Sequence, residues 1–266
     1  MSFANLSARQ SISAQARTIL TMLALTTLSH AAMGNESALP PCPKDKQQSW
    51  HNCFGAVEFG QGASYSGEWQ HDKRNGHGKF HYPNGSSYEG KWRSGWRHGK
   101  GFYIYEDGAT YKGDWVRGLR HGRGDYKHRS GARYTGGYKH DRKYGTGTFY
   151  YADGAVYSGE WKRGLRHGAG KYVFPNGSHY EGGFYAGRQH GRGKYTYADG
   201  SSYNGGWHHG RRQGRGIYRY ADGSRYEGGF KNDRYDGYGV RYAPDGSITS
   251  SGQWKADKLI KQELDL

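Results

Sequence analysis

"YSGEWQHDKRNGHGKFHYPNGSS" runs from Tyr65 to Ser87, and "YEGKWRSGWRHGKGFYIYEDGAT" follows directly from Tyr88. The second stretch keeps the Tyr, Gly, Trp, Gly-x-Gly and final x-Gly in place while the other positions vary. The first tyrosine recurs every 23 residues as Tyr65, Tyr88, Tyr111, Tyr134, Tyr157, Tyr180, Tyr203 and Tyr226. A fixed period of this size indicates a tandem array in which each unit is one supersecondary element.

Each unit has the pattern of two β-strands. Tyr65, Gly67 and Trp69 alternate with polar residues, and the run from Gly76 to Tyr82 alternates in the same way, which is the period of a strand. A polar turn joins the two runs, and an Asn-Gly or Asp-Gly pair follows, which favours a type I′ hairpin turn. We therefore predict an all-β fold: one elongated, twisted antiparallel sheet of tandem 23-residue hairpins, with about seventeen strands.

The repeated glycines fall on the same strand face as the repeated aromatic residues. Only 33% of the chain is hydrophobic, but 16% is aromatic, and there are 46 glycines. A strand glycine leaves space that a neighbouring side chain can fill. We expect a core of aromatic rings, each lying in a slot above glycines of a neighbouring strand, and we assign the repeated rings to packing rather than to ligand binding.

The combination of Y-x-G-x-W, G-x-G-x-Y/F and D/N-G at a 23-residue step resembles the MORN repeat family over residues 65–248. Tyr138, Phe184 and Phe230 stand where Trp69 stands, so the ring is kept. The eighth unit departs from the pattern, with Arg241 in the place of Phe80. The resemblance implies a non-enzymatic module for membrane association and protein–protein contact, as in junctophilins and phosphatidylinositol phosphate kinases, where other domains carry the specific activity.

The first 31 residues have the pattern of a secretory signal peptide. Arg9 and Arg17 precede the apolar run Ile19–Leu28, and small residues follow at Ser29 and Ala31. A membrane span needs about twice as many apolar residues. We therefore expect export to the periplasm or the medium. Peripheral attachment to a membrane is compatible with either location.

Both ends of the array are expected to be capped. Cys42 and Cys53 are the two cysteines, and in an exported chain they predict one disulfide. Residues 32–64 would form a disulfide-closed cap and a half-repeat over the first strand. Residues 249–266 would form an atypical terminal strand and a C-terminal cap that folds over it through Leu259, Ile260 and Leu264.

The net charge of +16 concentrates on one kind of turn. The window 70–75 and its seven repeats hold 17 Lys and Arg against four acids, whereas the window 83–87 and its repeats hold six acids and three Arg. The two windows lie on opposite edges of the expected sheet. We predict that the basic edge binds an anionic surface through one arginine per unit: Arg74, Arg97, Arg120, Arg142, Arg166, Arg188, Arg211 and Arg234.

Histidines accompany these arginines, so the edge should gain charge below about pH 6.5. The same windows contain His71, His98, His121, His140, His167, His190, His208 and His209. Four of them, His98, His121, His167 and His190, occupy one repeated position, so a metal site is one interpretation. We interpret them as solvated turn residues because no carboxylate or cysteine clusters with them.

No residue set for catalysis is visible, so we expect no enzyme, no cofactor, no metal site and no small-molecule substrate. The leading hypothesis is an exported scaffold or binding module at an anionic membrane or envelope polymer. The alternative is a scaffold for protein–protein contact that binds neither lipid nor polyanion. Nucleic acid is a weaker candidate partner, because the rings that would stack on bases are assigned to packing.

Overall fold

The computed structural model describes residues 37–45 and 47–263, which form one β-sheet unit. The predicted signal peptide, residues 1–31, lies outside the described residues. A short 3₁₀ turn, η1 (Gly60–Gly62), separates the first two strands. The strands are β1 (Cys53–Glu58), β2 (Ser64–Gln70), β3 (Lys73–His81), β4 (Ser87–Arg93), β5 (Trp96–Ile104), β6 (Thr110–Val116), β7 (Leu119–Lys127), β8 (Arg133–Lys139), β9 (Arg142–Tyr150), β10 (Val156–Lys162), β11 (Leu165–Val173), β12 (His179–Tyr185), β13 (Arg188–Thr196), β14 (Ser202–His208), β15 (Arg211–Arg219), β16 (Arg225–Lys231), β17 (Arg234–Tyr242), β18 (Ile248–Lys255) and β19 (Lys258–Gln262).

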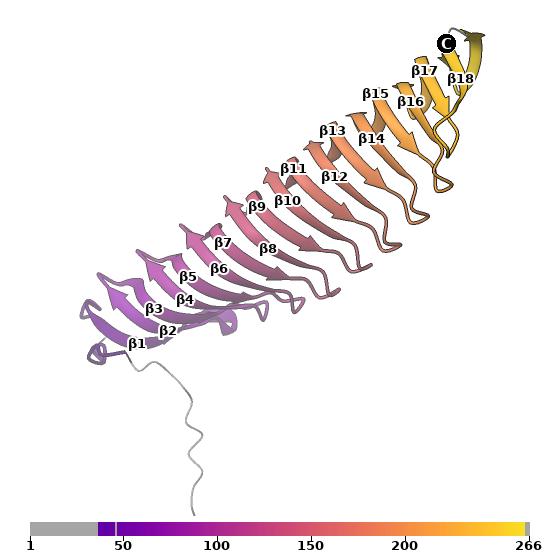
Figure 1. Cartoon of the computed structure of the whole chain (residues 1–266). Coiled ribbons are helices and arrows are strands. Elements are labelled where there is room, and N and C mark those ends of the chain that lie inside the picture. Colours follow the sequence, from indigo (N-terminus) through magenta and orange to yellow (C-terminus); the bar gives the residue numbers. More distant parts are fainter. Residues whose placement is uncertain (1–36, 46, 264–266) are drawn as a thin grey trace, which may run out of the picture. The chain divides into compact units, whose positions relative to one another are not determined.

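Each strand pairs antiparallel with the next strand along the chain, from β1 with β2 to β18 with β19 (Figure 1). The nineteen strands form a single sheet. The predicted all-β array of hairpins is confirmed. After the eighth unit, β18 is the expected terminal strand, and β19 is an additional strand that continues the meander.

The two kinds of turn differ from the prediction: the type I′ turn lies within each hairpin, and not at the Asn-Gly or Asp-Gly pair between hairpins. Within a hairpin, Ser94 and Gly95 both have positive φ, 48° and 84°, as a two-residue type I′ turn requires. In the Asn84-Gly85 loop only Gly85 has positive φ, and its N–H donates to the Tyr82 carbonyl at 3.0 Å. That loop is a type I turn followed by a left-handed glycine, so the type I′ prediction for Asn-Gly was wrong.

The glycine slots are present, and one tyrosine occupies each. A Cβ on Gly124 would lie 2.4 Å from the Tyr111 ring, and one on Gly113 would lie 2.5 Å from the Tyr111 hydroxyl. That hydroxyl donates to the Asp114 carbonyl at 3.0 Å. The first glycine of Gly-x-Gly serves a different purpose, since Gly122 lies in a β-bulge with φ of 56°.

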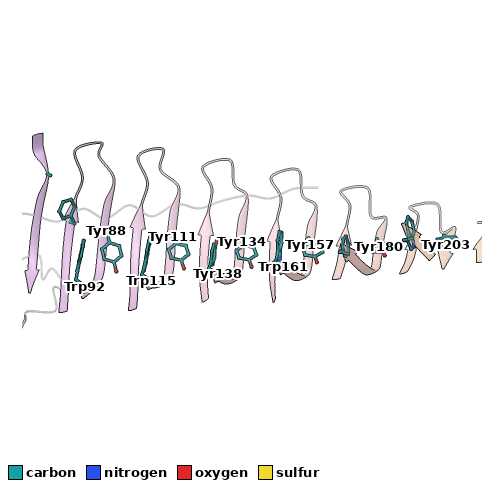
Figure 2. Packing of buried hydrophobic residues seen from close by; sticks show 14 of the residues in the cluster. Tyr88, Trp92, Tyr111, Trp115, Tyr134, Tyr138, Tyr157, Trp161, Tyr180 and Tyr203 are labelled. Carbon is teal, nitrogen blue, oxygen red and sulfur yellow. The ribbon is translucent and has the colours of Figure 1, made fainter. Parts of the chain in front are cut away.

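The aromatic core continues from unit to unit. Tyr88 is fully buried and meets Trp92 of its own unit edge-on, with centroids 5.1 Å apart. It also meets Trp115 of the next unit edge-on at 5.4 Å (Figure 2). Tyr138, at a tryptophan position, makes the same contact with Tyr111 at 5.3 Å. Because such pairs add about 0.5–1.5 kcal/mol each beyond buried area, the rings join neighbouring hairpins as well as filling their core.

The N-terminal segment before β1 packs against the first strands and contains the predicted disulfide. Cys42 and Cys53 form a disulfide, and the Cys42 N–H donates to the Phe54 carbonyl at 2.8 Å. The Trp50 ring packs edge-on against Trp69 with centroids 5.0 Å apart. The segment therefore covers the outer edge of β1, where an open row of backbone groups would invite pairing with another chain.

The C-terminal segment adds a strand instead of folding over β18. Ala256 and Asp257 have positive φ, 49° and 68°, so the chain makes another type I′ turn into β19. Leu259 packs against the core, but Ile260 is 63% exposed, and Leu264 lies outside the described residues. The expected folded-over cap is thus not formed by the described residues.

Candidate functional site

The eight predicted arginines fall into two groups on opposite faces of the sheet. Arg74, Arg97, Arg120 and Arg166 occupy one repeated position and lie half-buried on the aromatic face. The guanidinium carbon of Arg97 is 4.3 Å from the Trp115 ring centroid, and Nη2 donates to the Gly118 carbonyl at 2.8 Å. Arg97 therefore covers the core and bridges to the following hairpin.

The same bridge recurs in the other members of this group. Nη2 of Arg74 donates to the Gly95 carbonyl at 3.1 Å, and Nη2 of Arg166 donates to the Gly187 carbonyl at 2.7 Å. Arg212 makes an equivalent bond but was missed in the sequence, although its 46-residue distance from Arg166 is two repeat periods. Arg97, Arg120 and Arg166 are therefore structural contacts between hairpins and not free side chains of the basic edge.

The second group points away from the aromatic face. Arg142, Arg188, Arg211 and Arg234 lie one residue earlier in the unit, at the start of a strand, and all are exposed. Adjacent residues of a strand face opposite sides of the sheet, which separates these arginines from the first group. In the second to eighth units, six more exposed cations lie at the same hairpin turns: Arg93, Arg117, Lys139, Lys162, Arg163 and Lys231. None of these ten cations forms an ion pair within the described residues.

Three acids of the same turns, Asp72, Asp141 and Asp233, accept hydrogen bonds from backbone N–H groups. The Asp141 carboxylate accepts from the Arg120 N–H at 2.9 Å and from its Nε at 3.1 Å. Asp233 accepts from the Arg212 N–H in the same way at 2.8 Å. At the cap, hydrogen bonds from Trp50 and Ser49 hold the pKa of the Asp72 carboxyl below its ordinary value. These acids fasten one hairpin to the next and leave the exposed cations without neutralising partners.

Apolar side chains lie among these cations. Trp96 is 60% exposed, Leu165 is 52% exposed and Leu119 is 39% exposed. All three occupy the repeated position that carries Arg142 and Arg188 in other units. We call the ten exposed cations together with Trp96, Leu119 and Leu165 the hairpin-tip surface. These three residues could have been recognised in the sequence, because they are apolar, lie in the charged turn window and occupy a strand position that faces away from the aromatic core.

A long groove of about 1920 Å³ lies on the face opposite the aromatic rings. Its floor includes the backbone of paired glycines such as Gly113 and Gly124, and its walls carry polar and charged side chains, together with Phe102, between His77 and Asn204. Typical small-molecule pockets measure about 300–1,000 Å³. The size and openness of this groove suit an extended chain better than a compact ligand.

The predicted row of solvated histidines is uneven. His98, His121, His167 and His190 are half-buried, whereas His71, His140, His208 and His209 are exposed. Partial desolvation, followed by the nearby His208, His190 and Arg188, lowers the pKa of His209. His209 therefore gains its charge at a lower pH than an ordinary histidine. Within the described part of the chain, no helix is long and apolar enough to cross a membrane.

Comparison with known proteins supports the repeat assignment. The MORN repeat model matches residues 65–87, 88–110, 111–133, 134–156, 157–179, 180–202, 203–225 and 226–248. No curated protein sequence matches the chain.

Two solved structures are among those with a similar course of the chain. The TCP10 domain of CPAP from Danio rerio is 14% identical, with 75% of this chain and 99% of that domain covered and a TM-score of 0.37. The TCP domain of SAS-4 from Drosophila melanogaster, solved with a proline-rich motif of Ana2, is 13% identical, with 82% and 98% covered and a TM-score of 0.35.

The repeat model covers eight consecutive units without a gap, and its first residue in each unit is the buried tyrosine of the core. Repeats of this kind generally serve as non-catalytic binding units. The chain belongs to the MORN repeat family.

Proposed function

We propose that this protein is an exported scaffold or binding module that attaches to an anionic membrane through the hairpin-tip surface. The observation that carries the proposal is the mixture of unpaired exposed cations with Trp96, Leu119 and Leu165 at one edge. Cations near anionic lipid contribute about 1 kcal/mol each, and exposed Trp and Leu side chains enter the interface between headgroups and acyl chains. The Cys42–Cys53 disulfide supports an oxidising compartment, and hence the export part of the proposal.

Vesicle co-sedimentation tests this function. Wild type should bind vesicles that contain phosphatidylglycerol or phosphatidylserine and should not bind neutral phosphatidylcholine vesicles. A variant with Arg93, Arg117, Arg163 and Arg188 changed to Gln should bind at least tenfold more weakly. Replacing Trp96 and Leu165 with Ser should also weaken binding, because these side chains supply the apolar contact.

The groove face offers a matched control for charge. Changing Lys79, Lys100, Lys171 and Lys194 to Gln removes the same net charge from exposed positions away from the hairpin tips. This variant should bind vesicles nearly as well as wild type. Equal weakening by both four-residue variants would mean that net charge alone drives binding. Binding to a soluble anionic polysaccharide but not to vesicles would favour the envelope-polymer form of the hypothesis.

The groove supports a second candidate function, a scaffold for an extended protein segment. Its walls include Thr146 and Ser158, whose replacement by Arg would fill it without touching the aromatic core. If a partner recovered from the exported fraction binds wild type but not the Thr146→Arg/Ser158→Arg variant, and vesicles bind neither protein, the protein-scaffold function leads.

A further inference from the structure

Three histidines, one from the sixth unit and two from the seventh, meet beside the hairpin turn that follows β14. His190 lies in β13, His208 ends β14, and His209 begins the two-residue turn that follows. The register that pairs Gly191 with Trp207 places His190 opposite His208. One ring nitrogen from each histidine lies within 4.8 Å of the others. The positive φ of His209, 50°, turns the chain back so that consecutive histidines face the same point.

The donor set and spacing fit a transition-metal ion. Imidazole nitrogens suit zinc, copper, nickel and cobalt, whereas magnesium and calcium require oxygen ligands. In a tetrahedral zinc site the Zn–N distance of about 2.0–2.1 Å places the ligating nitrogens about 3.3 Å apart. The three rings must therefore approach by about 1.5 Å or less. His208 and His209 are exposed, so rotation of their side chains can supply this movement without disturbing the sheet.

The surroundings of His190 give an independent reason. Its Nδ1 atom is shielded from solvent and has no hydrogen-bond partner among the described residues. A buried polar atom without a partner is costly, and coordination through Nδ1 would supply one. The nearby Arg188 opposes a cation, and Tyr185 packs against His190 with centroids 5.5 Å apart.

Other units of the array show what is special about this turn. His167 occupies the same repeated position as His190, but Tyr185 and Ala186 stand beside it in the places of His208 and His209, and the His167 and Tyr185 rings are 5.3 Å apart. His121 has one histidine neighbour, His140, at 5.4 Å. The three-histidine combination arises only where His208 and His209 follow each other, among the units that the structure describes.

We propose that His190, His208 and His209 form a binding site for a divalent transition-metal ion, with zinc as the probe and a fourth position open to water or a partner's ligand. The site does not depend on membrane binding. Its sequence signature is the His208-His209 pair placed 18 and 19 residues after His190.

Zinc titration of the untagged protein, purified by cation exchange and freed of metal with a chelator, tests the site. Competition against a chromophoric chelator should show one tight equivalent. His208→Ala and His209→Ala should each weaken that equivalent at least tenfold, and His190→Ala should do the same. With copper(II) as a second probe, electron paramagnetic resonance should show three nitrogen ligands in wild type and fewer in each variant.

His167→Ala is the matched control, since it removes a histidine from the same repeated position in the preceding unit. It should leave the tight equivalent unchanged. His208 and His209 are exposed, so their variants should keep the wild-type circular dichroism and melting temperature. The proposal is overturned if wild type takes up no stoichiometric zinc, or if His167→Ala weakens binding as much as His208→Ala does.

Discussion

At the residue scale, the array uses glycine for two unrelated physical purposes. Gly113 and Gly124 supply space, because a Cβ at either position would collide with Tyr111. Gly118 supplies a backbone conformation, with φ of 82° in a two-residue turn. Asp141 occupies the turn position of Gly118 in the next unit with φ of 62°, so a side chain is tolerated there if the residue accepts the left-handed region.

Gly124→Val should therefore lower the free energy of unfolding far more than Gly118→Asp. The first change forces a branched side chain into the Tyr111 ring, an overpacking cost of about 1–3 kcal/mol or more. The second reproduces the arrangement of Asp141 and should shift stability by less than about 1 kcal/mol. Chemical denaturation of both variants measures the difference. Equal midpoints would show that the slot does not limit the core.

Lys143 is an exception within the row of bridging arginines. Its Nζ lies 4.2 Å from the ring centroids of both Trp161 and Phe149. Burial, followed by the nearby Arg166, lowers its pKa from 10.5 to about 8. The four-carbon ammonium side chain covers the rings as the arginines do, but no hydrogen bond joins it to the carbonyl of Gly164, the counterpart of Gly118.

Lys143→Arg should stabilise the protein by about 1 kcal/mol, because a guanidinium can reach that carbonyl as Arg97 and Arg166 reach theirs. Wild type should also gain stability as the pH rises from about 7 to 10. In that range the unfolded chain, with a lysine pKa near 10.5, binds more protons than the folded chain. The arginine variant should lack this component. Thermal melts of both proteins at pH 7 and pH 9 measure it, and parallel pH profiles would contradict the assignment.

At the scale of the elements, hairpins are joined by contacts that repeat with the period. The Arg97 bridge to Gly118, the Asp141 bond to the Arg120 backbone and the edge-on ring pairs all cross from one hairpin to the next. Each hairpin thus depends on its neighbours, as expected for an array stabilised by nearest-neighbour interfaces. The first hairpin lacks a preceding unit, and the disulfide-closed cap supplies the missing contacts.

Reduction of the Cys42–Cys53 disulfide, or the Cys42→Ser/Cys53→Ser double variant, should lower stability by about 2–3 kcal/mol through the entropy of the short loop it closes. The loss should be greatest at the N-terminal end, where Trp50 packs on Trp69. Hydrogen exchange of β1 and β2 against β12 and β13 measures this gradient. A central hairpin that loosens as much as the first would contradict a cap that acts locally.

At the scale of the whole sheet, the repeated hairpin tips concentrate exposed charge along one edge. Equivalent residues of adjacent units are two strands apart, about 9–10 Å, which is close to the screening length of about 8 Å at physiological ionic strength. Neighbouring charges along the edge therefore act together on an anionic surface. Added salt shortens the screening length and weakens this combined attraction. The exposed His71, His140, His208 and His209 lie at the same turns.

Binding to anionic vesicles should tighten as the pH falls from 7.5 to 5.5 and weaken as salt increases. The lowered pKa of His209 places its proton uptake below the ordinary value of 6.5, so its part of the gain should appear at the lower end of this range. A variant with His140, His208 and His209 changed to Gln should lose most of this pH dependence while keeping the salt dependence. Co-sedimentation with a chelator present measures both, and an unchanged pH profile would exclude these histidines.

The sequence alone determined the period, the hairpin architecture and the tyrosine positions, because alternation and a constant 23-residue step are local properties of the chain. It did not determine which cations are free. Arg120 and Arg142 belong to the same turn window but occupy adjacent positions of the repeat, and one residue of register moves a side chain to the other face. The β-bulge at Gly122 and the pairing of β13 with β14 are properties of strands in contact, so the half-buried arginine row and the meeting of His190, His208 and His209 were decided only by the tertiary structure.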